Sequence, residues 1–161
     1  MEEKATALSF TDILRRQITP AIEMLRDAID QCSEDMWKQS SANAPIWEQV
    51  YHATFWLNAW ARDWSTPFEK PAFHSDQALE LESGASPVIT REQMQDYLNK
   101  AKRECMSFID GLTDDTLLIK QEGRDYTPAD RIIGQIRHVQ HHVGMIHAQI
   151  KEATGKYPKW T

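Results

Sequence analysis

The stretch RIIGQIRHVQHHVGMIHAQI, residues 131–150, decides how this chain folds. Its branched apolar residues recur at steps of three and four, the spacing of one buried face of an α-helix. This core stripe comprises Ile132, Ile136, Val139, Val143, Ile146 and Ile150. Upstream, Thr127 followed by Pro128 is a strong helix start, and Gly155 is typical of a helix end. We therefore expect one long amphipathic helix over residues 128–154.

Three earlier segments carry the same helical periodicity. They cover roughly residues 10–32, 45–64 and 90–111. Pro20 lies inside the first segment, where its ring removes a backbone donor and crowds the preceding turn. We expect either a kink there or a helix that restarts with Thr19 as its cap. No segment shows the strict alternation that is typical of a half-buried strand.

Long connections separate these helices. Residues 40–44 form a polar stretch, and residues 65–89 contain three prolines, Gly84 and several serines without sustained periodicity. Residues 112–126 form the last connector. We therefore predict an all-α fold, a four-helix bundle with a long loop between its second and third helices. A chain of 161 residues fits one domain, so we expect a single bundle domain over residues 1–161.

Composition excludes several functional classes. The formal net charge of -6 argues against nucleic-acid binding, which needs clustered Lys and Arg. The two cysteines, Cys32 and Cys105, lack the spacing of a metal knuckle or a disulfide framework. The N-terminal segment is not like a signal peptide, and the most apolar stretch, residues 53–61, is too short to span a membrane. We expect a cytoplasmic protein that binds neither nucleic acid nor membrane.

Histidine is concentrated in the last expected helix. His138 and His142 are four residues apart, so their imidazoles project from the same side of successive turns and can converge on one ion. They lie beside the core stripe, where a bundle would line a pocket. At about 100° per residue, His141 and His147 project in other directions. Helical phase therefore selects His138 and His142 from the four histidines of this helix.

A metal site needs a further ligand, and His52 is the best candidate. It lies in the middle of the second expected helix, among aromatic residues such as Tyr51 and Trp56 that line either a pocket or the core. The alternative is that His52 is a hydrogen-bonded core histidine, because a pair of histidines four apart is a weak metal signal by itself. The zinc-protease motif does not apply, since Val139 and Gln140 supply no general base.

Several polar residues are weak candidates for catalytic or positioning roles. Glu48 lies one turn before the histidine of the second helix, and Gln135 and Gln149 share the column of the histidine pair. For Glu48 we favour a solvated position on the helix surface over a role at the site. Arg131 lies on the same column, where it could meet an anionic substrate or form a salt bridge to Asp130 or to another helix.

Three stretches resemble the DinB/YfiT-like superfamily. The run RHVQHHVGMIHAQI, residues 137–150, is similar to its last-helix signature, in which two histidines separated by three residues precede a short pair containing Gly. The stretches MLRDAIDQCSEDMW, residues 24–37, and WEQVYHATFWLNAW, residues 47–60, resemble the first half of the family. Gly144 matches the family's glycine after the second histidine. Together these stretches extend the resemblance over essentially the whole chain.

The resemblance implies one divalent metal ion in a helical bundle. The family's three ligands fall on His52, His138 and His142. Three imidazoles leave a coordination position open, as in catalytic rather than structural sites. Zinc is the first expectation for such a donor set, and nickel, cobalt and iron(II) bind similar sets.

The resemblance also indicates a class of reaction. Superfamily members include thiol-dependent transferases and a thiol-dependent isomerase, so we expect a transferase that adds a low-molecular-weight thiol to a small-molecule substrate. A metal-dependent hydrolase is the alternative among enzymes. A bundle that only binds metal or forms oligomers is the alternative outside enzymes. Relatives often dimerise, and a homodimer is expected.

Overall fold

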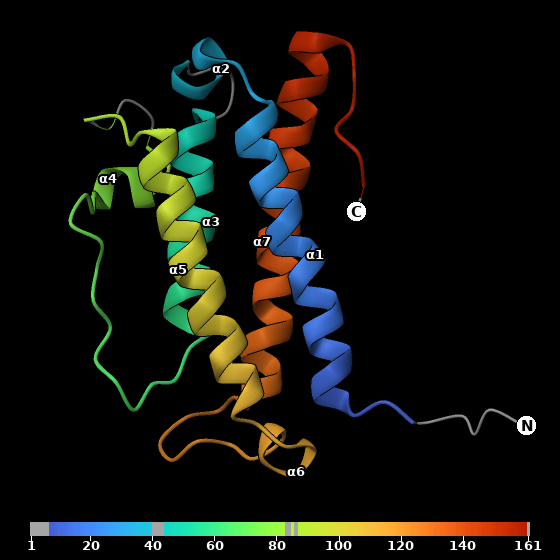
Figure 1. Cartoon of the computed structure of the whole chain (residues 1–161). Coiled ribbons are helices and arrows are strands. Elements are labelled where there is room, and N and C mark those ends of the chain that lie inside the picture. The colour runs from blue at the N-terminus through green and yellow to red at the C-terminus, as the bar shows by residue number, and fades with distance from the viewer. Residues whose placement is uncertain (1–6, 40–43, 83–84, 86, 161) are drawn as a thin grey trace, which may run out of the picture.

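The computed structural model describes residues 7–39, 44–82, 85 and 87–160. Over these residues the chain forms seven helices and no strand. Four long helices form a bundle (Figure 1): α1 (Phe10–Gln31), α3 (Ile46–Trp60), α5 (Arg91–Asp110) and α7 (Pro128–Thr154). Three helices of four or five residues lie in the connections: α2 (Glu34–Lys38), α4 (Asp76–Leu79) and α6 (Asp114–Leu117). The predicted all-α bundle is confirmed.

The long crossover between α3 and α5 determines the order of the bundle. Both α1 and α3 pack mainly against α5 and α7, so α1 and α3 lie on one diagonal. The helices α3 and α5 run in the same direction, because Tyr51 lies against Tyr97 and, further along both helices, Asn58 donates to Glu104 at 2.6 Å. Two parallel helices require the chain to return along the bundle, and residues 61–90 make that return (Figure 1).

Local signals set the bounds of α7 where the sequence predicts them. The Thr127 side chain accepts from the backbone N–H of Asp130, and the Asp130 carboxylate accepts from the backbone N–H of Thr127 at 2.8 Å. At the other end Gly155 adopts φ 76°, a left-handed conformation that favours glycine. Five of the six stripe residues are buried, and Ile136 is half-buried. The stripe therefore faces the core.

The first helix, α1, continues through Pro20. The predicted restart with Thr19 as a cap is wrong, because the Thr19 hydroxyl instead contacts the Met106 sulfur at 3.8 Å. The ring of Pro20 still removes one backbone hydrogen bond. Ile18 and Ile22 are fully buried on either side of it, and tertiary packing of this kind outweighs a local loss of helix stability.

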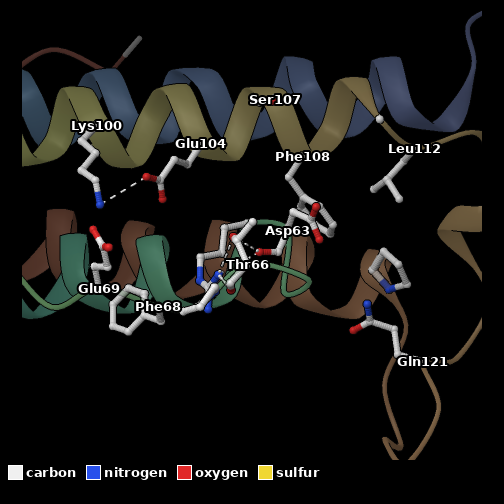
Figure 2. A pocket seen from close by; sticks show the side chains of 14 residues that line it. Asp63, Thr66, Phe68, Glu69, Lys100, Glu104, Ser107, Phe108, Leu112 and Gln121 are labelled. Atoms are coloured by element: carbon white, nitrogen blue, oxygen red, sulfur yellow. Dashed lines mark hydrogen bonds and ion pairs between the residues drawn. The ribbon is translucent and has the colours of Figure 1, made fainter.

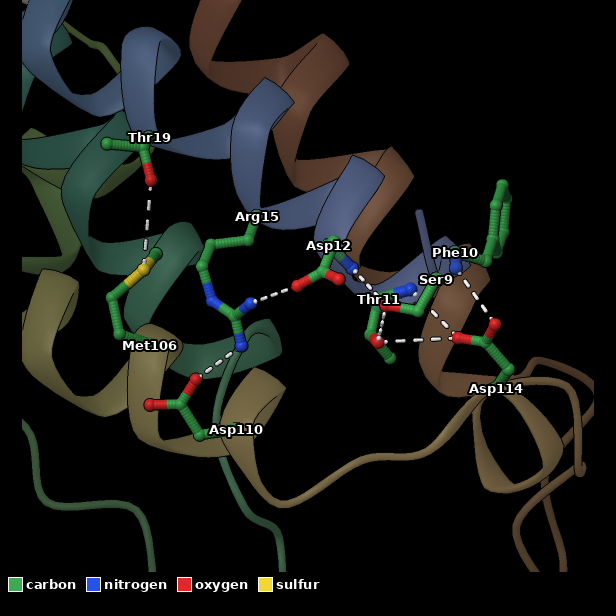
Figure 3. A network of polar contacts seen from close by, with 9 residues as sticks. All are labelled: Ser9, Phe10, Thr11, Asp12, Arg15, Thr19, Met106, Asp110 and Asp114. Atoms are coloured by element: carbon green, nitrogen blue, oxygen red, sulfur yellow. Dashed lines mark hydrogen bonds and ion pairs between the residues drawn. The ribbon is translucent and has the colours of Figure 1, made fainter. Parts of the chain in front are cut away.

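The start of α1 is capped from a distant part of the chain. Asp114, the first residue of α6, accepts from the backbone N–H groups of Phe10 at 2.9 Å and Thr11 at 3.0 Å (Figure 3). These N–H groups have no partner within the helix, so the carboxylate satisfies them. Arg15 then reaches Asp110 at the end of α5. The two contacts join α1, α5 and α6 at one end of the bundle.

The helix α3 ends at Trp60, four residues before the predicted end at Trp64. Arg131 of α7 is the cause, because its buried guanidinium donates to the carbonyl oxygens of Trp60 and Arg62. The indole N–H of Trp64 also turns back to the carbonyl of Ala59 at 2.9 Å. These donors satisfy carbonyls that a helix end leaves without partners. A residue 71 positions away therefore sets this boundary.

Most of α3 is enclosed by the rest of the bundle, since eleven of its fifteen residues are buried. No helix in the described part of the chain is both long and apolar enough to cross a membrane. Of the predicted connector at residues 40–44, residues 40–43 lie outside the described residues, as does Gly84 of the crossover.

Candidate metal centre

Three histidines from two antiparallel helices meet inside the bundle. His52 comes from α3, and His138 and His142 come from α7. Each offers a ring nitrogen, and these atoms lie within 4.8 Å of one another. The ring centroid of His52 is 5.1 Å from that of His138 and 4.7 Å from that of His142. Among the described residues this is the one cluster of three or more side chains that could hold a metal ion.

The crossover fixes the orientation of His52. Its Nδ1 atom lies 2.5 Å from the backbone carbonyl oxygen of Leu79, the last residue of α4. A carbonyl only accepts, so Nδ1 carries the proton and donates it. In the neutral ring the Nε2 atom then holds a lone pair, and it faces Nε2 of His138 at 3.1 Å. A backbone carbonyl behind a ligand histidine is the usual way to fix its tautomer.

Burial keeps the three imidazoles neutral. It lowers the pKa of His142 to about 3 and that of His138 to about 4, and the neighbouring His52 acts in the same direction on both. Burial also lowers the pKa of His52, although the bond to Leu79 opposes this change. Neutral imidazole is the form that binds metals, so no proton has to leave these rings at pH 7.

These residues fit a divalent cation. The lone pair on His52 Nε2 accepts a hydrogen bond from Nε2 of His138 at 3.1 Å, and a cation between the rings would take the place of that proton. The Nδ1 atoms of His138 and His142 are buried without a hydrogen-bond partner in the described structure. Three imidazoles are a borderline-soft donor set that suits several first-row metals. The cluster could therefore hold one divalent ion.

The other histidines lie outside the cluster, as helical phase predicts. His141 is exposed, with its ring centroid 5.2 Å from that of His142. His147 is buried in α7 but does not join the cluster. His74 of the crossover bonds the hydroxyl of Tyr51 at 2.5 Å. Tyr51 is fully buried and pairs with the crossover, so it is a core residue.

The three weak candidates have different surroundings. Glu48 is fully buried, so the predicted solvated position is wrong. Its carboxylate accepts a hydrogen bond from the backbone N–H of Ala85 at 3.2 Å, and this bond connects the crossover to α3. Gln149 donates to the carbonyl of Ala44, ahead of α3. Gln135 is buried beside His138, and its Oε1 atom has no partner in the described structure. A catalytic role for any of them stays a prediction.

A cavity of about 560 Å³ adjoins the cluster, and we call it the aromatic cavity. It is lined by Trp56, Trp60, Tyr126, Asp130, Arg131, Gly134, Gln135 and His138. The ring of Trp56 also lies edge-on to His52 at 6.4 Å. The volume is within the range of about 300–1,000 Å³ that small-molecule sites occupy. Because His138 belongs to both, the histidine cluster borders a space of ligand size.

The sequence alone reveals little of the aromatic cavity. It indicates Trp56 as a candidate pocket residue, but it does not single out Trp60, Tyr126 or Gly134. Tyr126 lies in a connector without periodicity, and it reaches the cavity because α7 starts two residues later. Four tryptophans at positions 47–64 are the only signal that the sequence offers.

Arg131 does not form its predicted salt bridge within the described part of the chain, and a contact with an anionic substrate stays a prediction. It is buried, and besides the two carbonyls at the end of α3 it donates to the Gln121 side chain at 3.1 Å. Its guanidinium lies 3.7 Å from the Trp64 ring centroid and 4.5 Å from that of Phe108. No ion pair to Asp130 forms within the described part of the chain. Burial lowers the pKa of Arg131 to about 10, so it stays charged at pH 7 and supports the fold.

A second cavity, of about 680 Å³, lies between the crossover and α5 (Figure 2). Its wall is rich in charged side chains, among them Lys100 and Glu104, which pair at 3.2 Å. Glu69 of the crossover points toward this pair from the opposite side (Figure 2). None of the three clustered histidines lines this cavity, so it does not belong to the metal centre.

Comparison with known proteins agrees with the fold. A sequence model of the DinB superfamily matches residues 17–146, a range that contains all three clustered histidines. None of the curated proteins matches the chain significantly. Among solved structures, a conserved protein from Enterococcus faecalis is similar in fold, with a TM-score of 0.66 and 15% identity over 93% of this chain and 100% of that one. Because the family model covers most of its length, this chain belongs to the DinB superfamily.

Proposed function

We propose that this protein is a metal-dependent transferase that joins a low-molecular-weight thiol to an electrophilic small molecule. One observation carries the proposal: His138 is part of the histidine cluster and also part of the wall of the aromatic cavity. A molecule in the cavity would lie against one of the metal ligands. Three protein ligands also leave one coordination position of a tetrahedral ion open to substrate or water. Structural zinc sites, in contrast, usually have four protein ligands.

Zinc is our first choice of metal, with nickel, cobalt and iron(II) as alternatives. When bound, such an ion lowers the pKa of a coordinated thiol and so supplies a thiolate near neutral pH. The sulfur provides the electron pair of the new S–C bond, the leaving group departs with the pair of the broken bond, and the thiol proton passes to solvent. His52, fixed by Leu79, holds its lone pair in place throughout.

The cavity wall favours thiol transfer over hydrolysis. Hydrolysis would call for a general base beside the water, and Asp130 is the one carboxylate in the lining. One oxygen of Asp130 already accepts from the Thr127 backbone and hydroxyl, each at 2.8 Å. A thiolate needs no such base. Trp56 and Trp60 give this cavity a largely apolar wall, which suits an organic acceptor molecule.

The test of the metal centre is elemental analysis of protein purified without added metal. We expect about one divalent ion per chain in the wild type and its loss in His52→Ala and His138→Ala. His141→Ala is the matched control, since His141 contacts the ring of His142 yet lies outside the cluster. Equal metal content in all four proteins would refute the site.

The test of the transferase is a panel of physiological thiols with an activated aryl halide as the acceptor. We expect turnover by the metal-loaded protein with at least one thiol and none by His138→Ala. A metal-loaded protein that is inactive with every thiol would refute the transferase and favour the hydrolase or a non-catalytic bundle. The homodimer stays a prediction, and sedimentation of the purified chain measures it directly.

A further inference from the structure

The short helix α4 is held at both ends by consecutive residues of α3. His52 donates from Nδ1 to the carbonyl oxygen of Leu79, the last residue of α4. The preceding residue, Tyr51, bonds through its hydroxyl to Nδ1 of His74 at 2.5 Å. His74 lies two residues before the start of α4, immediately ahead of its cap, Ser75. The tyrosine and the candidate ligand therefore contact opposite ends of one helical turn.

The bond between Tyr51 and His74 joins a buried residue to the exposed side of the crossover. Tyr51 is fully buried, and burial raises the pKa of its hydroxyl to about 12, so this group stays neutral at pH 7. On the far side of the His74 ring, Nε2 lies 2.7 Å from the Asp76 carboxylate and 2.8 Å from the Lys70 ammonium. A hydroxyl both donates and accepts, so it bonds Nδ1 in either tautomer of His74.

Phe55 holds the ring of His74 in place. It lies one turn after Tyr51 on α3, and its ring stacks on that of His74 with the centroids 5.3 Å apart and the planes at 27°. The hydrogen bond fixes one edge of the imidazole, and the stacking fixes its tilt. His74 therefore gives the start of α4 a defined position against α3.

The helix α4 transmits the position of His74 to Leu79. The backbone N–H of Leu79 donates to the carbonyl oxygen of Ser75 at 3.0 Å, and the Ser75 side chain accepts from the backbone N–H of Ala78 at 3.2 Å. These bonds make the segment a single turn whose two ends move together. A shift of His74 would therefore move the Leu79 carbonyl away from Nδ1 of His52.

We propose that His74 is a positioning residue of the candidate metal centre. Its bond to Tyr51 places α4 so that the Leu79 carbonyl keeps the proton of His52 on Nδ1 and the lone pair on Nε2, which faces the cluster. This inference deepens the proposed function and rests on it for the metal alone. The tautomer of His52 is a property of the metal-free chain and is measured separately.

Tyr97 provides the matched control for Tyr51. It is a second buried tyrosine, its ring centroid lies 6.4 Å from that of Tyr51, and its hydroxyl has no hydrogen-bond partner in the described structure. NMR of the metal-free protein with ¹⁵N-labelled histidine distinguishes the two tautomers of His52, and His52→Gln assigns its signals. We expect the Nδ1–H tautomer in the wild type and in Tyr97→Phe, and a mixture of tautomers in Tyr51→Phe. An unchanged tautomer in Tyr51→Phe would overturn the proposal.

Two substitutions of His74 separate a positioning role from a general effect on folding. Leucine retains an apolar contact with Phe55 but cannot bond the tyrosine hydroxyl, whereas the amide of asparagine can. Both substitutions lose the contacts to Asp76 and Lys70. By zinc titration we expect His74→Leu to bind about three- to tenfold more weakly than the wild type, the equivalent of one net hydrogen bond, and His74→Asn to stay within about twofold. Wild-type affinity in His74→Leu, or equal losses in both variants, would overturn the role of His74.

Metal content measured in the same samples separates this inference from the proposed function. A metal-loaded protein whose Tyr51→Phe and His74→Leu variants keep both the tautomer of His52 and the zinc affinity refutes the positioning role alone. A protein that holds no metal but changes its His52 tautomer in Tyr51→Phe refutes the metal centre, and with it the transferase, alone. The two proposals can therefore fail independently.

Discussion

The carbonyl oxygen of Leu79 lies 2.5 Å from Nδ1 of His52, so the crossover orients a residue of the histidine cluster. The position of that carbonyl depends on how α4 packs, because the Leu79 side chain is buried. A candidate metal centre formed by two bundle helices thus depends on a third segment that contributes no histidine to it. This dependence can be tested without changing any histidine.

Leu79→Ala should weaken metal binding by about tenfold, because loss of the second contact behind a ligand histidine typically has this effect. It should also lower the free energy of unfolding by about 2–4 kcal/mol through the cavity it leaves. Leu117→Ala is the control, since Leu117 is a buried leucine at the end of another four-residue helix, α6. Metal titration and urea unfolding measure the two effects. An equal loss of metal affinity in both variants would indicate a general loss of stability.

Acid should destabilise the metal-free protein between about pH 6.5 and pH 4. The unfolded chain protonates its histidines near the ordinary value of 6.5, whereas burial lowers the pKa of His138 to about 4 and that of His142 to about 3. The unfolded state therefore binds more protons, and the stability present above pH 6.5 is lost as the pH falls. Each of these histidines contributes at most about 1.4 kcal/mol per pH unit.

Urea unfolding at several pH values, with a chelator present, measures this slope. His142→Gln removes one of the titrating groups and should give a shallower dependence. His141→Gln should change the dependence less than His142→Gln does, because His141 is exposed and its charge is the smallest of the causes that lower the pKa of His138 and His142. A wild-type stability that stays flat from pH 6.5 to pH 4 would contradict the prediction.

Arg131→Lys should lower the free energy of unfolding by about 2–3 kcal/mol. A lysine cannot donate to both carbonyls at the end of α3 while lying flat on the Trp64 ring. Carbonyls left buried without a donor carry the cost of their desolvation. Arg137→Lys, on an exposed position of the same helix, should change stability by less than about 0.5 kcal/mol. Chemical denaturation of the three proteins measures the difference, and similar values for both variants would argue against this role.

Local sequence signals predict the positions of the long helices well. They do not predict the contacts between distant residues that adjust where a helix ends or how a side chain is buried. The bounds of α7 follow from Thr127 and Gly155, which act within their own turns. Helical phase likewise separates His138 from His141, because both lie on one regular helix. Phase alone does not bring His52 to that pair, and the family resemblance is needed for it.

The errors share one physical cause, a partner far away in sequence. The early end of α3 depends on Arg131, and the burial of Glu48 depends on Ala85 of the crossover. The hydrogen bond behind His52 comes from a backbone carbonyl, which leaves no side-chain pattern to detect. Such contacts arise only when the crossover is folded against the bundle.

The distance along the chain between His52 and His138 has a consequence for folding. These residues are 86 positions apart, so their approach requires the closure of a long loop. Contacts of high sequence separation form slowly, because the entropy of closure is lost before the contact stabilises the chain. The three histidines should therefore come together late, after the separate helices have formed. The rate at which the refolding chain binds a metal ion would then report the rate at which the complete bundle forms.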